Sequence, residues 1–386
     1  MVKRGVATFT LDTGQCPRWL FERMARLGGQ VAEIIVEEFG PDEFIRRLGD
    51  PAWFQSLGTV LAFDWNASGL TTILTAALKE SLRGRETRLG LFICGGKGRT
   101  SRRTPQEIAS WGQILGLSEN RYAGLAYNSR MAAKVDSALV QDGYQIYHHA
   151  FFFSRNGAWA VVQQGMNTGS QTARRYHWSS ERVTDLVCEP HSGIITQRRN
   201  PTLDLTARAS TGNRQLSLDL VRSGHASLEK EIKVLRRYWS NYVRTLAIKS
   251  GQQEMVFLEL ADREFHWHPV AGESFRSSPY LDRILARVCE RNPESYETML
   301  SLAGVGPRTM RALSLVAEVI YGARPSYEDP ARYSFAHGGK DATPYPVDRA
   351  TYDRSIEFFE RVIRRMRIGQ VEKDALLKKI SRSGGR

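Results

Sequence analysis

The chain has 386 residues, of which 41% are hydrophobic and 25% are charged, as is typical of a globular protein. This length predicts two or three folded units. No apolar run reaches the roughly 18 residues that span a bilayer, and the first residues lack the apolar core of a signal peptide. These patterns argue against a membrane partner and predict a cytoplasmic location. The four cysteines have no CxxC spacing, which argues against a zinc ribbon or a disulfide framework.

The formal net charge of +13 is the first functional signal. A positive surface gains free energy when it releases the counterions that are condensed on nucleic acid. Of the 54 basic residues 43 are Arg, which suits bidentate contact with phosphate, although a GC-rich genome would produce the same bias. We therefore expect DNA as the partner. Single- and double-stranded DNA both stay open, and so does the oligomeric state, with a homodimer as one alternative.

Residues 1–142 are predicted to be mainly helical. Proline and cap signals predict one helix from Pro17 to Glu38, another from Pro41, and a third that Asp50 caps.

The apolar run 89–96 predicts a buried strand that leads into a glycine-rich basic loop, Gly95 to Arg103. Thr104 and Glu107 have capping-box spacing for the helix that follows. Successive backbone N–H groups in such a loop can bind an anion, although the full GxxxxGK[ST] pattern is absent. The alternatives are a solvated basic turn and a nucleic-acid contact through four cations, Lys97, Arg99, Arg102 and Arg103.

Residues 143–277 are predicted to be rich in strands, either as a separate unit or as one domain with 1–142. Two apolar runs flank Asn156-Gly157, which is a strong hairpin signal. The composition also predicts a helix at 227–248 and further strands, at 185–190, 193–198 and 255–260.

Residues 278–372 are predicted to be a helical unit, followed by a disordered basic tail at 373–386. In this unit Ala303-Gly304-Val305-Gly306 resembles the turn of a helix-hairpin-helix element. The predicted fold class is therefore α+β, with a mixed helix and strand N-terminal region followed by an all-α helix-hairpin-helix domain.

The resemblance implies that the turn binds a DNA phosphate. Gly304 and Gly306 would adopt unusual φ values and bring bare backbone close to the phosphate. The second helix, which Pro307 opens, would present unpaired N–H groups to it. Three side chains would add contacts, namely Arg308, Thr309 and Arg311. The alternative is a glycine turn between two core helices.

Val347-Asp348 resembles the pair that carries the catalytic carboxylate in helix-hairpin-helix DNA glycosylases. The resemblance covers about residues 280–370, and the spacer from Gly306 to Asp348 is longer than in that family. Bifunctional members place a catalytic Lys after the second glycine, where this chain has Pro307 and an arginine, which forms no Schiff base at neutral pH. Lys340 is the nearest substitute, with phosphate contact as its alternative role.

Nearly the whole chain also resembles an archaeal and bacterial family of unknown function. The matching segments are PRWLFERM, FDWNASGLTT, GGKGRTSR, YHHAFF and HGGKDATPYPVD. This resemblance implies no activity.

Polar residues in apolar surroundings suggest a second site before the turn. A carboxylate with one or two imidazoles can bind a divalent metal, Mg²⁺ or Mn²⁺, that activates water against a phosphodiester. His148 and His149 are neighbours on a predicted strand, so only one of them can face such a site. The candidate catalytic residues are Asp64, His148, His149, Glu189 and His191, and the candidate metal ligands are Asp64, His148, Glu189 and His191. The alternative for each histidine is a hydrogen-bonded place in the core.

Three functions follow from these patterns. The first is a metal-dependent nuclease that grips DNA nonspecifically with the hairpin. The second is a base-excision glycosylase that uses Asp348 on a flipped-out base. The third is a DNA-binding protein without catalysis.

Overall fold

The computed structural model describes residues 16–61, 67–196, 199–234, 278–331 and 349–384. Its centre is an antiparallel sheet of five strands in the order β1-β3-β4-β5-β6. The strands are β1 (Leu91–Lys97), β3 (Gln145–Ser154), β4 (Trp159–Asn167), β5 (Thr172–Ser179) and β6 (His191–Ile195). A short ladder joins β2 (Val140–Gln141) to β7 (Leu203–Asp204). The predicted mixture of helices and strands is confirmed.

The β3–β4 hairpin forms where the sequence predicts it. Gly157 at its turn has φ 107°, which only glycine adopts without strain. The predicted strand at 185–190 is wrong, because the Asp185 carboxylate accepts the backbone N–H groups of Val187 and Cys188 and forms a turn instead. The predicted strand at 255–260 lies outside the described residues. The predicted helix at 227–248 is described only to residue 234, and those residues are helical.

One face of the sheet is covered by the N-terminal helices. They are α1 (Arg18–Phe39), α2 (Pro41–Leu48), α3 (Pro51–Val60), α4 (Ala67–Leu82) and α5 (Glu86–Leu89). The predicted cap of the third helix is confirmed, since Asp50 Oδ1 accepts from the N–H groups of Ala52 at 2.8 Å and Trp53 at 2.9 Å. These helices share a core with Ile93, Phe152 and Val162 of the sheet.

The C-terminal helices α14 (Arg349–Arg365) and α15 (Gln370–Gly384) join the same core. Phe359 of α14 stacks on Trp53 of α3 with ring centroids 5.4 Å apart, and Leu376 of α15 is buried. The predicted disordered tail at 373–386 is therefore wrong over most of its length, because Leu376 anchors α15 in the core that these helices share and α15 packs on α3.

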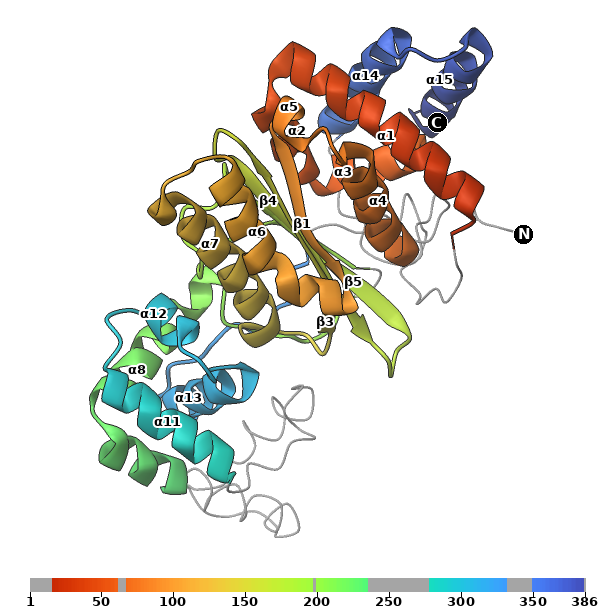
Figure 1. Ribbon diagram of the computed structural model, residues 1–386. Coiled ribbons are helices and arrows are strands. Elements are labelled where there is room, and N and C mark those ends of the chain that lie inside the picture. The colour runs from red at the N-terminus through yellow and green to blue at the C-terminus, as the bar shows by residue number, and fades with distance from the viewer. Residues whose placement is uncertain (1–15, 62–66, 197–198, 235–277, 332–348, 385–386) are drawn as a thin grey trace, which may run out of the picture.

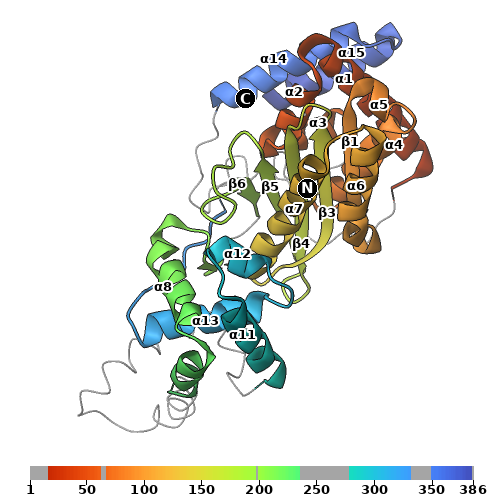
Figure 2. The same cartoon turned by 60° about the vertical axis from the view of Figure 1, so that its left-hand side comes forward.

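The other face of the sheet is covered by α6 (Thr104–Ile114) and α7 (Glu119–Ala138). The hydrophobic core on this face of the sheet also includes residues of four helices at one end of the molecule, which lie at the bottom of Figure 1 and Figure 2. They are α8 (Thr211–Arg222), α11 (Pro279–Arg291), α12 (Tyr296–Ser301) and α13 (Pro307–Val319).

The predicted unit 278–372 is divided between two places. Its first part, α11 to α13, packs with α8, whereas α14 packs with α1 and α3 at the opposite end of the molecule (Figures 1 and 2). The helix that follows Asp348 therefore belongs to a different layer from the glycine turn. None of the described helices is both long and apolar enough to cross a membrane.

Candidate functional site

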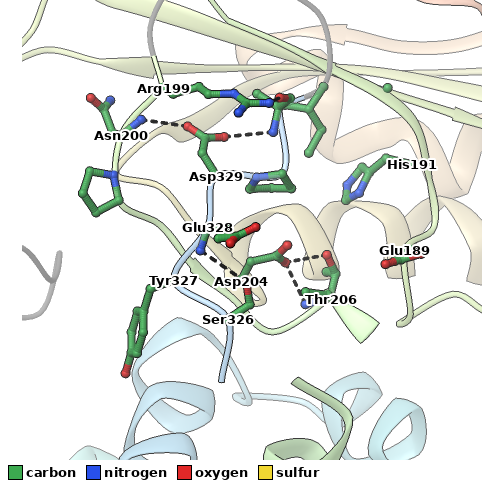
Figure 3. A pocket seen from close by; sticks show the side chains of 16 residues that line it. Glu189, His191, Arg199, Asn200, Asp204, Thr206, Ser326, Tyr327, Glu328 and Asp329 are labelled. Carbon is green, nitrogen blue, oxygen red and sulfur yellow. Dashed lines mark hydrogen bonds between the residues drawn. The ribbon is translucent and has the colours of Figure 1, made fainter. Parts of the chain in front are cut away.

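A pocket of about 820 Å³ lies where the edge strand β6 meets the loop after β7 and the segment 326–331. Figure 3 shows His191, Glu189 and Asp204 around it, together with Glu328 and Asp329. Two of the residues that the sequence predicts, Glu189 and His191, therefore share one pocket.

His191 is held by a buried carboxylate on α7. Its Nε2 lies 2.5 Å from Oδ1 of Asp136, whose side chain is fully buried. The indole N–H of Trp178 donates to Asp136 Oδ2 at 3.1 Å, and the amide of Gln163 donates to the same oxygen. A carboxylate that is fixed in this way orients the imidazole, as in hydrolases that use histidine as a general base.

The hydrogen bonds continue from Asp136 to His149. Gln163 Oε1 lies 2.8 Å from His149 Nδ1, and Ser129 Oγ lies 2.8 Å from His149 Nε2. Both ring nitrogens of His149 are thus used inside the protein, and burial lowers its pKa. His149 supports the Asp136–His191 pair from behind and does not line the pocket.

His148 points to the opposite face of the sheet. It is paired with Gln164, whose amide donates to the Ser68 carbonyl on α4, on the side away from α7. Its two ring nitrogens are buried without a hydrogen-bond partner, and burial lowers its pKa to about 3. The structure therefore does not bring His148 together with Glu189 and His191.

Glu189 and Asp204 supply carboxylates on the wall of the pocket. Glu189 is exposed and has φ 48°, a left-handed conformation that turns the chain just before β6. Asp204 Oδ1 accepts from the N–H of Thr206 at 2.9 Å and from its hydroxyl at 2.6 Å. Burial raises the pKa of Asp204, although the Thr206 hydrogen bonds oppose that rise.

The segment 326–331 is fixed to the sheet by a buried ion pair. Arg174 on β5 donates to Asp329 at 2.7 Å and 3.1 Å, and to Asp142 at 2.9 Å. Both partners are almost fully buried, so this network positions one wall of the pocket.

Sequence reasoning missed Asp136 and Asp204. Each is an acidic residue within an otherwise apolar pattern, Asp136 on the inner face of α7 and Asp204 between Leu203 and Leu205. A charged residue on an otherwise apolar face is the sequence signal that could have identified both of them.

A divalent metal finds no complete ligand set in the described ranges. Among those residues no group of three or more His, Cys, Asp or Glu side chains could hold a metal ion. The predicted residues Asp64, Lys340 and Asp348 lie outside the described residues.

A glycine turn joins α12 to α13 at residues 302–306. Gly304 has φ 88°, as predicted, but Gly306 has φ −154° and is extended. A Cβ atom on Gly306 would have no atom of the described residues within 4 Å, so the space beside it is open in the part of the chain that the structure describes. Pro307 is the first residue of α13, which has no side-chain cap, and Arg308 is exposed. The first turn of α13 therefore presents backbone N–H groups that no capping side chain covers.

Two further residues predicted to contact DNA lie in the protein interior or against it. Thr309 is only 3% exposed, which leaves its side chain no surface for a phosphate. Arg311 Nε donates to Gln141 Oε1 at 2.6 Å, so part of its guanidinium is bound to the end of β2.

The glycine-rich loop 95–103 forms a 3-10 helix, Gly98–Arg103, after β1. The predicted capping box is wrong, because Thr104 is the first residue of α6 and not its cap, and the Glu107 carboxylate reaches back to Gly95 instead. That carboxylate accepts from the Gly95 N–H at 3.0 Å and from Lys79 Nζ at 2.7 Å. The four predicted phosphate-binding side chains of the loop are all exposed, namely Lys97, Arg99, Arg102 and Arg103.

One family model matches residues 5–347 of the chain, and its description is "Protein of unknown function (DUF763)". The chain belongs to this family. The match confirms the resemblance of nearly the whole chain to a family of unknown function, and it ends before α14 and α15. No curated protein and no solved structure matches the chain.

Proposed function

We propose that this member of the family binds the sugar-phosphate backbone of DNA through a helix-hairpin-helix element made of α12, the turn 302–306 and α13. The open space beside Gly306 carries this proposal. A phosphate oxygen can approach the bare backbone there and accept hydrogen bonds from the first turn of α13. Contacts of this kind grip DNA without selecting a base sequence.

Charge supports the same partner. Arg308 is exposed at the start of α13, where its positive charge adds to that of the helix dipole. The exposed cations of the loop 95–103 and the net charge of +13 would attract the DNA from a distance.

We propose further that the chain hydrolyses DNA, with His191 as the general base. A proton on Nε2, facing Asp136, leaves Nδ1 free to accept a proton from water. The water oxygen would then form a bond to phosphorus while the bond to the leaving sugar oxygen breaks. Asp204, whose pKa is raised by burial, is the candidate to give that oxygen a proton. The divalent metal stays a prediction, and no step here depends on it.

The glycosylase alternative has less support. In that family the catalytic carboxylate follows the hairpin within one helical domain, whereas here the helix after Asp348 packs on α1 and α3. A DNA-binding protein without catalysis is the third alternative.

The test is incubation of the purified protein with labelled single- and double-stranded DNA, with Mg²⁺, Mn²⁺ or chelator, and with alkali treatment of half of each sample. We expect cutting without alkali, and a rate about 10²–10⁴-fold lower for His191→Gln, the usual range for loss of a general base. His225→Gln is the matched control, since His225 does not line the pocket.

Each outcome separates the proposals. Cutting only after alkali, and its loss in Asp348→Asn, would favour the glycosylase. Binding without cutting under any condition would leave the DNA-binding protein. A chain that binds neither form of DNA at low salt would contradict the whole proposal.

A further inference from the structure

The turn 302–306 is held from behind by one ammonium group on α7. Lys134 Nζ donates to the carbonyl oxygens of Leu300 at 2.7 Å, Leu302 at 2.6 Å and Val305 at 3.4 Å. These three carbonyls span the end of α12 and the whole turn. A single side chain from a distant part of the sequence therefore bridges both ends of the turn.

The position of this cation has a physical reason. The last carbonyls of a helix lack partners within the helix, and they carry the negative end of its dipole. Lys134 satisfies the Leu300 carbonyl of α12 together with two carbonyls of the turn, and it lies partly buried beneath them. Without it, these carbonyl oxygens would lose their charged donor, and the Leu302 oxygen would keep only the weaker hydrogen bond from the Val305 N–H at 3.3 Å.

The same contacts fix the direction of the backbone N–H groups. No described peptide bond is cis, and in a trans peptide the C=O and N–H groups point in opposite directions. Because the Val305 carbonyl faces Lys134, the N–H of Gly306 in the same peptide unit faces away from α7. The Leu302 carbonyl directs the N–H of Ala303 away in the same manner.

Other contacts dock the element on α7 and β2. Tyr127 donates to Glu297 of α12 at 2.7 Å, and Gln141 Nε2 donates to the Pro307 carbonyl at 3.0 Å. Neither of them touches the turn itself. Lys134 thus acts directly on the conformation of residues 302–306, together with the Val305 N–H, which donates to the Leu302 carbonyl inside the turn.

We propose that Lys134 is a positioning residue for DNA binding. It holds the turn so that the backbone N–H groups of Ala303 and Gly306 point away from α7, and it does not itself contact the DNA phosphate. This inference rests on the proposed function. Asp136, two residues further along α7, orients His191. The same helix therefore carries both the residue that holds the turn and the residue that orients His191.

The test compares Lys134→Met with Arg130→Met by DNA binding across a salt series. Arg130 is an exposed residue one turn earlier on α7, so its variant loses the same charge from the same helix. We expect Lys134→Met to bind DNA about tenfold more weakly, because charged hydrogen bonds are lost behind the turn. The slope of log K against log salt concentration should be the same for Lys134→Met as for the wild type, because the variant loses no phosphate contact. Arg130→Met should bind nearly as the wild type does.

Chemical rescue separates positioning from a loss of folding. Methylammonium can enter the space left in Lys134→Ala and donate to the same carbonyls, whereas tetramethylammonium has no N–H group. At equal ionic strength we expect methylammonium alone to restore DNA affinity.

The outcomes distinguish this inference from the function on which it rests. If the wild type binds DNA and Lys134→Met binds it equally well, the inference fails and the proposed function stands. If the slope of log K against log salt concentration falls by about 0.9 in Lys134→Met, then Lys134 contacts a phosphate directly. That result would overturn the proposal that Lys134 only positions the turn. If the wild type binds no DNA, the proposed function fails first.

Discussion

The turn 302–306 and the loop 95–103 are both short and glycine-rich, but they use their backbones in opposite ways. In the loop, the N–H and the carbonyl of Gly95 are bound inside the protein, by Glu107 and Lys79. In the turn, Lys134 binds the carbonyls from behind, and the space beside Gly306 is open.

This difference shows that a glycine can be needed for close packing or for an exposed backbone, and that the sequence alone does not distinguish the two. Gly95 is required because neighbouring atoms leave no room for a side chain, whereas Gly306 leaves room that the protein does not fill. Of these two glycines, only Gly306 has backbone that is open to a ligand. Substitution of each glycine should therefore affect stability in one segment and DNA binding in the other.

The largest effect is expected for Gly95→Ala. A Cβ atom there would lie 2.3 Å from the His149 carbonyl oxygen and 2.4 Å from the Thr104 hydroxyl, at φ 84°. Backbone strain and overpacking together should lower the free energy of unfolding by roughly 2–5 kcal/mol. Denaturant unfolding measures this loss.

Gly98→Ala in the same loop is the control. Gly98 has φ 61° but no atom of the described residues within 4 Å of its Cβ position, so only backbone strain of about 1–2 kcal/mol is expected. Equal losses for the two variants would show that Gly95 is not closely packed.

A smaller loss of stability is expected for Glu107→Ala. This variant leaves the Gly95 N–H and the Lys79 ammonium without their shared acceptor, which should cost about 1–3 kcal/mol of unfolding free energy. Glu107→Gln keeps an acceptor for the Gly95 N–H and should lose less. Thermal unfolding of both variants measures the difference, and an unchanged melting temperature for Glu107→Ala would argue against the internal use of this backbone.

Individual surface cations should have the smallest effects. Arg308→Gln should lower the slope of log K against log salt by about 0.9, the value for one lost phosphate contact. Arg99→Gln should change this slope less, because we propose that the loop attracts DNA only from a distance. Fluorescence anisotropy across a salt series measures both slopes. A larger change for Arg99→Gln would place the loop, and not the turn, at the phosphates.

Local signals in the sequence predicted much of this structure. Proline and Asp50 marked the starts of the first helices, and Asn156-Gly157 marked the central hairpin, because each acts on backbone only a few residues away. The turn between α12 and α13 was predictable for the same reason. The tail was not, because the burial of Leu376 depends on a surface formed by distant helices.

The pocket was predictable only in part. His191 and Glu189 stood out as polar residues near a predicted strand, but their partners come from elsewhere in the chain. Asp136 approaches His191 from α7, and Lys134 approaches the turn from the same helix. Alternation along a strand predicted that His148 and His149 face opposite sides, but only the packing of α7 decides which of them joins the Asp136 network.

The most direct test of the account is the DNA affinity of Gly306→Val across a salt series, measured beside its unfolding free energy. Valine fits the extended backbone at this position, and its Cβ atom would have no atom of the described residues within 4 Å, so stability should be nearly unchanged. Its side chain would fill the space of the proposed phosphate, and DNA affinity should fall about tenfold or more, which is about 1.4 kcal/mol. Wild-type affinity in a stable Gly306→Val variant would contradict the claim that this turn binds DNA.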